Sequence, residues 1–190
     1  MKKKLMLATM LIVVLSLFMA GCAKSEPPKT PDTNNPPTND TKEPDAVTSA
    51  SQAPDEATFE QKISKDGNFI IITSKDLTFT KDLTVDGTFT KKNAEGKEVP
   101  TRSLALAQYG KDNSVIRYTL TVPKIVINSE NTLLEYGTIK GDVYVQTPGF
   151  KTKDATIDGN LYFKTKELMD AFKADETTKI TGKIEVKEYK

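Results

Sequence analysis

Histidine and tryptophan are absent from this sequence of 190 residues, and cysteine occurs once. Without histidine the chain cannot form a Ser/His/Asp or Cys/His relay, and it has no imidazole to bind a metal. A large charge of either sign is also missing, because 27 basic residues balance 26 acidic ones. This balance gives no reason to expect nucleic acid as a partner. We therefore expect no metal, no cofactor and no enzyme activity.

The first 21 residues have the three parts of a secretory signal peptide. Lysines at positions 2–4 are followed by an apolar run over residues 5–19 and by the small residues Ala20 and Gly21. The run is shorter than the roughly 20 residues that a membrane-spanning helix needs, although a retained span is the alternative. The sequence therefore predicts export.

The single cysteine, Cys22, comes next. The ending Met-Ala-Gly-Cys at residues 19–22 resembles the lipobox of bacterial lipoproteins, with Met19 where leucine is usual. The resemblance implies that Cys22 is diacylated, becomes the first residue of the mature chain and anchors it in the lipid of a cell membrane, on the extracytoplasmic side. Two acyl chains hold a protein stably where one is marginal. The alternative is a stray thiol, but a lone cysteine is unusual in an exported protein.

A proline-rich stretch separates the cysteine from the rest of the chain. Residues 23–58 hold seven of the ten prolines and no aromatic residue. Such a segment buries too little apolar surface to offset the entropy lost on ordering. Together with Cys22 it predicts a disordered linker over residues 22–58, which leaves a folded domain over residues 59–190. At about 3.1 Å per residue, an extended linker holds that domain tens of Å from the lipid.

The predicted domain contains a repeated sequence motif. TIKGDVYV at residues 138–145 returns as TIDGNLYF at 156–163, and KITGKIEV at 179–186 keeps the pattern apolar-x-Gly-x-apolar-x-apolar. A period of two puts alternate side chains on opposite faces, as in strands with one buried face. The predicted fold class is therefore all-β.

Glycine recurs at a fixed interval in this pattern. Gly87, Gly141 and Gly159 lie on one lattice of period 18, which predicts a parallel β-helix, a solenoid with rungs of about 18 residues that stack on one another. An evenly spaced antiparallel meander is the alternative. Glycine is expected where the chain turns or backbones approach closely. The full set of repeat glycines is Gly67, Gly87, Gly141, Gly159 and Gly182.

The lattice also predicts two columns of core side chains. One is Val85, Thr121, Ile139, Ile157 and Ile180, and the other is Phe89, Ile125, Val143, Leu161 and Ile184, with Pro123 in a glycine place between the columns.

Two segments depart from the lattice. Residues 91–121 fit it poorly and predict an inserted hairpin around the turn at residues 110–113. Residues 164–176 predict a short helix with Thr165 as its cap. Its apolar side chains, Leu168, Met169 and Phe172, lie on one side, where they would cover the core.

The rungs resemble the β-helix domain of bactofilins and related polymer-forming bacterial proteins, over residues 66–90 and 121–186. This resemblance implies a right-handed parallel β-helix with a scaffolding role, and self-association by end-to-end stacking.

Candidate binding and catalytic residues are few. Tyr144 and Tyr162, one rung apart, predict an exposed strip for a cell-wall polysaccharide or another partner, although tyrosine also suits a half-exposed strand. Two aspartate pairs and two arginines supply the residue types of glycoside hydrolases and polysaccharide lyases, but turns and solvated faces explain the aspartates as well. These residues are Asp82 with Asp86, Asp154 with Asp158, Arg102 and Arg117.

These features favour a membrane-anchored lipoprotein that acts as a structural scaffold or interaction platform in the cell envelope. The alternatives are a polysaccharide-binding module and a polysaccharide-active enzyme.

Overall fold

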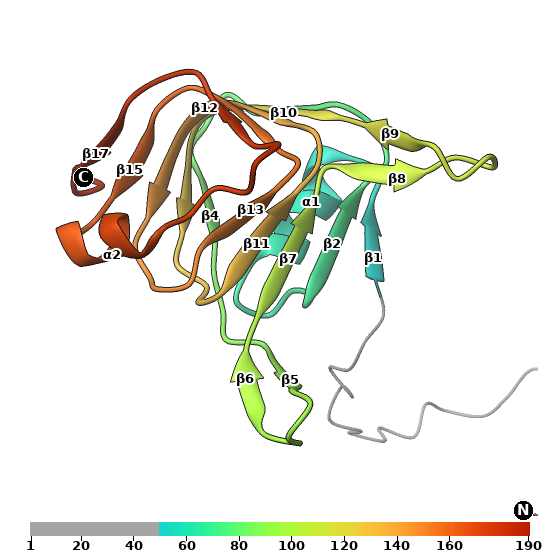
Figure 1. The fold of residues 1–190 in the computed structure, drawn as a ribbon. Coiled ribbons are helices and arrows are strands. Elements are labelled where there is room, and N and C mark those ends of the chain that lie inside the picture. The colour runs from blue at the N-terminus through green and yellow to red at the C-terminus, as the bar shows by residue number, and fades with distance from the viewer. Residues whose placement is uncertain (1–49) are drawn as a thin grey trace, which may run out of the picture. The chain divides into compact units, whose positions relative to one another are not determined.

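A computed structural model describes residues 50–190 (Figure 1). The predicted signal peptide, Cys22 and most of the predicted linker lie outside the described residues. Both large sheets of the described part consist of parallel strands. The protein is therefore mostly β-structure, as the all-β prediction requires.

Short strands are the main secondary structure of the described chain, with one helix near each of its ends. The elements are β1 (Ala50–Ala53), α1 (Glu56–Ile63), β2 (Ile70–Thr73), β3 (Leu77–Thr78), β4 (Leu83–Val85), β5 (Thr90–Lys92), β6 (Glu98–Pro100), β7 (Arg102–Ala105), β8 (Ala107–Tyr109), β9 (Val115–Arg117), β10 (Thr119–Ile127), β11 (Thr132–Glu135), β12 (Thr138–Val145), β13 (Lys151–Lys153), β14 (Thr156–Asp158), β15 (Leu161–Phe163), α2 (Lys166–Ala171), β16 (Lys179–Ile180) and β17 (Ile184–Val186).

The chain passes back and forth between two parallel sheets. Sheet A has the order β1-β2-β7-β11-β13, and sheet B has the order β16-β14-β12-β10-β3. Strands β4, β15 and β17 extend sheet B, because the second halves of β10 and β12 pair with β4 and β15, and β15 pairs with β17. From β2 to β13 the chain returns from sheet B to the next strand of sheet A each time. After β14 and β15 it continues through α2 to β16 and β17 of sheet B, so β1 and β17 lie at opposite ends of the stack (Figure 1).

The repeated phrases are neighbours in this stack. Ile139 of β12 lies beside Ile157 of β14, and Val143 lies beside Leu161 of β15, each in parallel register. Since an antiparallel meander would pair the same strands in the opposite direction, that alternative is wrong for this part of the chain.

The predicted core columns are confirmed for the last rungs and wrong for the first. Leu120, not Thr121, lies beside Ile139, because Val122 and Pro123 together stand opposite Gly141 and form a bulge in β10. Two insertions between β4 and β10 interrupt the 18-residue period, so the predicted places of Val85 and Phe89 in the core columns are also wrong. The observed columns are Leu77, Leu120, Ile139, Ile157 and Ile180, and then Leu83, Ile125, Val143, Leu161 and Ile184.

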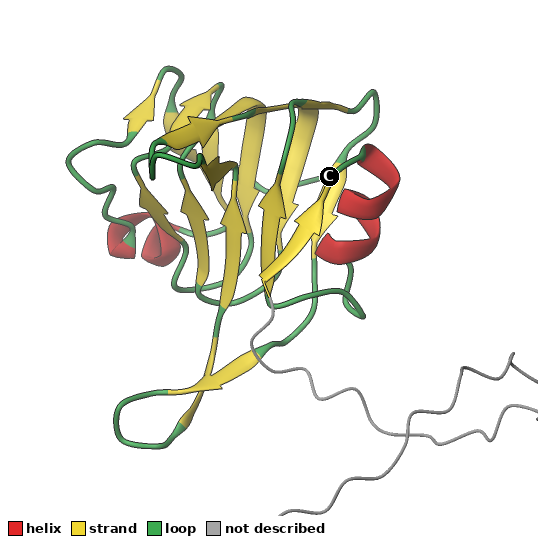
Figure 2. Cartoon of the chain, turned by 90° about the vertical axis from the view of Figure 1, so that its right-hand side faces the viewer, coloured by secondary structure: helices red, strands yellow, loops and turns green. Residues whose placement is uncertain are grey.

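Those insertions are two antiparallel hairpins. The hairpin of β8 and β9 turns at residues 110–113, which confirms the predicted one. A second hairpin, β5 with β6, was not predicted, and it projects from the stack (Figure 2). Between the two hairpins, β7 returns to sheet A.

The two helices pack against the core at different places, α1 beside β1, β2 and β4, and α2 beside β15 and β17. Asp55 caps α1 by accepting a hydrogen bond from the Thr58 amide at 2.8 Å, and Phe59 and Ile63 of this helix are buried. Thr165 caps α2, as predicted, although the helix ends at Ala171 and is shorter than expected. Three of its apolar side chains pack half-buried against the core, as expected for a core cover: Leu168, Met169 and Phe172.

The fold begins earlier than the composition predicts. Residues 50–58, assigned to the linker, form β1 and the first turn of α1. Strand β1 pairs with β2 along its whole length, and Ala53 is fully buried. Pairing with a neighbouring strand therefore orders a segment whose own side chains are small or polar.

Three of the five repeat glycines form a column at one corner of the stack. A Cβ on Gly159 would lie 2.2 Å from the carbonyl oxygen of Gly141, and one on Gly182 would lie 2.5 Å from that of Gly159. Gly67 and Gly87 are not part of this column, since their nearest backbone neighbours are Lys62 and Lys65 near the end of α1. Both are tightly packed, so they are structural for a different reason.

We predict that Gly159→Ala lowers the free energy of unfolding by about 3 kcal/mol, because the methyl group would displace the backbone of the neighbouring rung. Gly96→Ala is the control. Nothing lies within 4 Å of a Cβ at Gly96, although its φ is +76°, so this variant costs only about 1 kcal/mol of backbone strain. Urea unfolding followed by circular dichroism measures both, and equal losses would show that the glycine column is not a close contact.

Candidate binding surfaces

The two candidate tyrosines stack but are not exposed. Tyr144 of β12 and Tyr162 of β15 lie side by side, with ring centroids 4.8 Å apart. Their exposed fractions are only 4% and 7%. The predicted exposed strip is therefore wrong, because another part of the chain covers these rings.

The cover is the C-terminal segment, residues 187–190. The Lys187 ammonium lies 4.3 Å from the centre of the Tyr162 ring, and the Tyr189 ring meets Tyr144 edge-on at 5.4 Å. The Tyr189 hydroxyl donates to the Asp82 carboxylate at 3.1 Å, which holds the segment across several strands of sheet B. The repeat pattern ends at residue 186, so nothing in it signals this contact.

The candidate carboxylates are occupied by structural contacts. Asp82 pairs with Lys124, Asp86 accepts from the Gly87 amide, Asp154 pairs with Arg117, and Asp158 accepts from the Thr181 hydroxyl. This is how turns and strand edges use aspartate, and the contacts explain the four residues without catalysis.

Arg102 holds two corners of the fold together. Its side chain is fully buried and donates to the carbonyl oxygens of Lys62 and Asp86, both at 2.6 Å, while its guanidinium lies 4.1 Å from the Phe89 ring centre. Burial lowers the pKa of Arg102 to about 10, and the nearby Asp86 charge opposes this shift. Arg102 therefore stays charged at neutral pH and does not act as a base. Its structural role is long-range, so no local sequence pattern reveals it.

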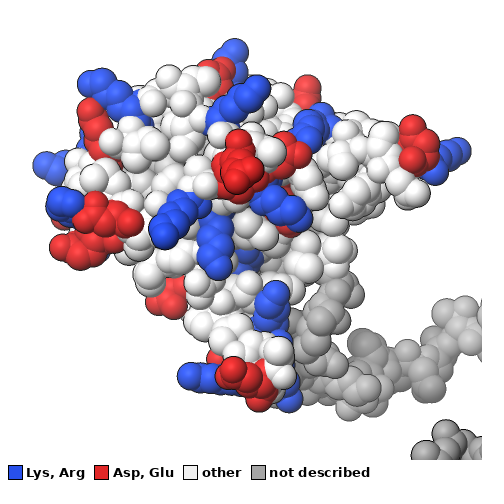
Figure 3. Space-filling model, viewed as in Figure 1, with Lys and Arg blue, Asp and Glu red and all other residues white. Residues whose placement is uncertain are grey.

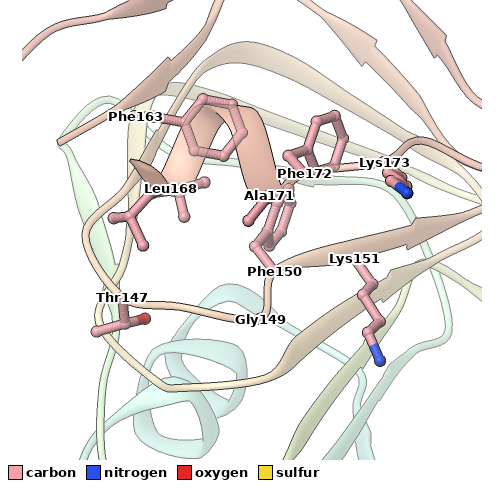
Figure 4. A pocket seen from close by; sticks show the side chains of 10 residues that line it. Thr147, Gly149, Phe150, Lys151, Phe163, Leu168, Ala171, Phe172 and Lys173 are labelled. Atoms are coloured by element: carbon pink, nitrogen blue, oxygen red, sulfur yellow. The ribbon is translucent and has the colours of Figure 1, made fainter. Parts of the chain in front are cut away.

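A small cavity lies beneath α2. It has a volume of about 250 Å³, and in Figure 4 the rings of Phe150, Phe163 and Phe172 gather between the helix and the strands. Phe172 lies 5.3 Å from Phe163 and 5.8 Å from Phe150, between ring centroids. Thr147 and two lysines are the polar residues of its lining. The cavity belongs to the closure of the core by α2.

A larger groove opens beneath the β8–β9 hairpin, on the outer face of sheet A. We call it the hairpin groove, and its volume is about 350 Å³. Its lining is Ile70, Ile72, Ala105, Ala107 and Val115, the rings of Tyr109 and Tyr136, and the polar side chains of Gln52, Gln108, Glu135 and Lys153.

The charges in the hairpin groove are paired with each other. Lys153 contacts the Glu135 carboxylate at 3.3 Å, and the Ser103 hydroxyl donates to the other oxygen of that carboxylate at 3.1 Å. Hydrogen bonds to Glu135 and then to Tyr136 raise the pKa of Lys153. The groove is therefore polar on one side but carries no net charge.

Two tyrosines form the aromatic part of the groove. Tyr109 is 67% exposed, and its hydrogen bond with Tyr136 raises the pKa of Tyr109. Tyr136 has a φ of +57°, a left-handed conformation that is rare for a bulky residue and occurs often at functional sites. The cations of Arg117 and Lys153 lie 5.5 and 5.4 Å from the Tyr136 ring centre. Tyr109 therefore offers the more accessible ring.

The last strand of the stack is an exposed edge. Among the described strands β17 pairs only with β15. Ile184 and Val186, which continue the core columns, are each 46% exposed. At the other end of the stack α1 buries Phe59 and Ile63.

The surface charge of the described domain is mixed. Figure 3 shows basic and acidic side chains interspersed over the viewed face. Neither helix within residues 50–190 is long and apolar enough to cross a membrane. In the same residues, no three acidic side chains gather closely enough to hold a metal ion.

Comparison of the chain with protein-family models, with curated protein sequences and with solved structures gives no match.

We predict that alkaline pH releases the C-terminal segment. The hydrogen bond to Asp82 is the first cause that raises the pKa of Tyr189 above its usual 10.0. Since the pKa is raised in the fold, this contact stabilises the segment fully below pH 10 and is lost as the pH rises through the raised value. Asp82→Asn should bring the pKa of Tyr189 back toward 10, as followed by NMR of labelled tyrosine. Asp112→Asn, in the β8–β9 turn, is the control, and an unchanged Tyr189 titration in Asp82→Asn would contradict the contact.

Proposed function

We propose that this chain is a bacterial lipoprotein, anchored by an acylated Cys22 on the extracytoplasmic side of a cell membrane. Its described domain is a parallel β-helix that serves as an interaction platform in the cell envelope. The anchoring rests on the signal peptide, the residues 19–22 that resemble a lipobox, and the proline-rich linker. No catalytic centre is part of this proposal.

The solenoid part of the proposal is supported by the in-register stacking of strands. From β2 to β15, each rung contributes to sheet A and then to the two halves of sheet B, and Ile139 and its neighbour Ile157 are 18 residues apart. In such a stack of rungs, the rung at each end has a neighbour on one side only. Each end therefore needs a covering element or a binding partner.

The observation that carries the platform function is the exposed edge of β17. Ile184 ends one core column and Val186 lies beside Phe163, and each is 46% exposed, so apolar surface is left at the end of the stack where β17 has a partner on one side only. The chain enters the described domain at β1, at the opposite end of the stack.

A second copy of the chain fits this edge. Lys183, Glu185 and Lys187 alternate along β17. In an antiparallel pair of two β17 strands shifted by two residues, Lys183 of each copy lies opposite Glu185 of the other, and opposite charges stabilise such cross-strand pairs. Two copies that pair through the same β17 edge are related by a two-fold axis, so the expected assembly is a closed dimer and not a filament.

We predict that Cys22→Ser abolishes labelling of the chain with radioactive palmitate in a bacterial host and moves the protein out of the membrane fraction. Without the thiol there is no site for the acyl chains. Ser25→Ala is the control and should remain labelled. Labelled Cys22→Ser protein would contradict the lipoprotein assignment.

We predict that a chain beginning at residue 23 dimerises at high concentration and that Ile184→Lys with Val186→Lys makes it monomeric. Two buried ammonium groups at the interface would carry an uncompensated desolvation cost. Ile116→Lys is the control, because Ile116 is similarly exposed, at 41%, on the β8–β9 hairpin. Light scattering gives the mass, and a wild-type chain that stays monomeric would contradict self-association through β17.

A further inference from the structure

The hairpin groove has features of a ligand site that the platform function does not use. Its volume of about 350 Å³ lies within the range of small-molecule sites, roughly 300 to 1,000 Å³. Its lining is mainly apolar with a few polar groups on one side, which is also typical of such sites. We propose that the hairpin groove binds a neutral glycan that carries N-acetyl groups. The biological setting of this ligand, though not its binding, rests on the proposed location in the envelope.

The aromatic ring of Tyr109 supplies the platform for a sugar. It is 67% exposed and lies with Tyr136 in the lining of the hairpin groove. The face of an aromatic ring is electronegative, so it attracts the weakly positive C–H groups of a pyranose ring laid against it. A tyrosine side chain has only two χ angles, so it loses little conformational freedom when it binds.

Polar side chains beside Tyr109 match the hydroxyl groups of a sugar. Gln108 and Gln52 carry amides that both donate and accept hydrogen bonds, and the Glu135 and Lys153 pair adds a strong acceptor and a donor. Because these two charges neutralise each other at 3.3 Å, an acidic polysaccharide would gain little net attraction. A neutral sugar leaves the ion pair intact.

The apolar floor favours an acetamido group over a plain hydroxyl. Ile70 and Ile72 project from the outer face of β2, half-buried, and Ala105 lies beside Ile72 on β7. A methyl group placed on this floor removes apolar surface from water, whereas a hydroxyl there would lose its hydration without a partner.

The backbone of the floor makes an added peptide strand a poor fit. Strands β2 and β7 are each paired on both sides within sheet A. Strand addition requires an unpaired edge, so the floor can recognise a ligand only through its side chains. A proline-rich segment, such as the chain's own linker, remains a defined alternative occupant for the test, because such segments dock on aromatic grooves.

The test is isothermal titration calorimetry on the full chain in detergent micelles. The probes are the tetramer of β-1,4-linked N-acetylglucosamine, the matching tetramer of glucose, and a peptide of residues 23–49. We expect binding of the N-acetylglucosamine tetramer, about tenfold weaker binding of the glucose tetramer, and no binding of the peptide.

Variants of the hairpin identify the site. Tyr109→Ala should weaken binding of the N-acetylglucosamine tetramer about tenfold, and Tyr109→Phe, which keeps the ring, should bind within about twofold of wild type. Ile116→Ala, on the same hairpin but outside the groove lining, should bind as wild type. Circular dichroism checks that each variant is folded.

Several results would overturn the proposal. The proposal is wrong if the N-acetylglucosamine tetramer does not bind at millimolar concentration, or if Tyr109→Ala binds it as well as wild type does. It is also wrong if the glucose tetramer binds as well as the N-acetylglucosamine tetramer, or if the peptide binds in a way that depends on Tyr109. Palmitate labelling and dimerisation through β17 do not involve Tyr109. If palmitate labelling and dimerisation are retained but the sugar does not bind, only this inference is rejected. If the sugar binds but labelling and dimerisation fail, only the proposed envelope platform is rejected.

Discussion

The close approach of backbones at the glycine corner is the constraint on which the rest of this structure depends. Gly141, Gly159 and Gly182 stack there, with room for a hydrogen atom but not for a methyl group. The next residue in each rung strengthens the contact: the Asp142 carboxylate accepts from the Asn160 amide, and the Asn160 side chain accepts from the Lys183 amide, both at 2.9 Å. These contacts hold successive strands in register, and the register in turn aligns the core columns.

Apolar side chains fill the space between the two sheets, so a binding partner can reach only the outer faces of the sheets and the ends of the stack. On the outer face of sheet B the C-terminal segment covers Tyr144 and Tyr162, whereas the outer face of sheet A carries the hairpin groove. The two ends differ as well, since α1 buries its apolar side chains and β17 leaves Ile184 and Val186 exposed. In the proposed platform, the exposed β17 end would pair with a second copy, and the hairpin groove lies on the outer face of sheet A, away from that end.

The sequence was sufficient to predict the structure where the repeat is regular or the pattern is short. The pairing of Ile139 with Ile157, the hairpin turn at residues 110–113 and the Thr165 cap were all predicted, because each depends on a short pattern. The first rung was misplaced because two hairpins interrupt the period there. Burial of Tyr144 and Tyr162, the role of Arg102 and the hairpin groove depend on residues that are distant in the chain, and no local pattern brings these together. Nor did the composition of residues 50–58 indicate that they pair with β2.

Methyl and aromatic NOE measurements on the isotopically labelled chain would test the parallel register at its core. The account predicts strong contacts between Ile139 and Ile157 and between Val145 and Phe163, which are parallel neighbours. Contacts of Ile139 with Phe163 and of Val145 with Ile157 would mean that the same strands run antiparallel. That result would contradict the stacked-rung architecture and, with it, the exposed end and the groove.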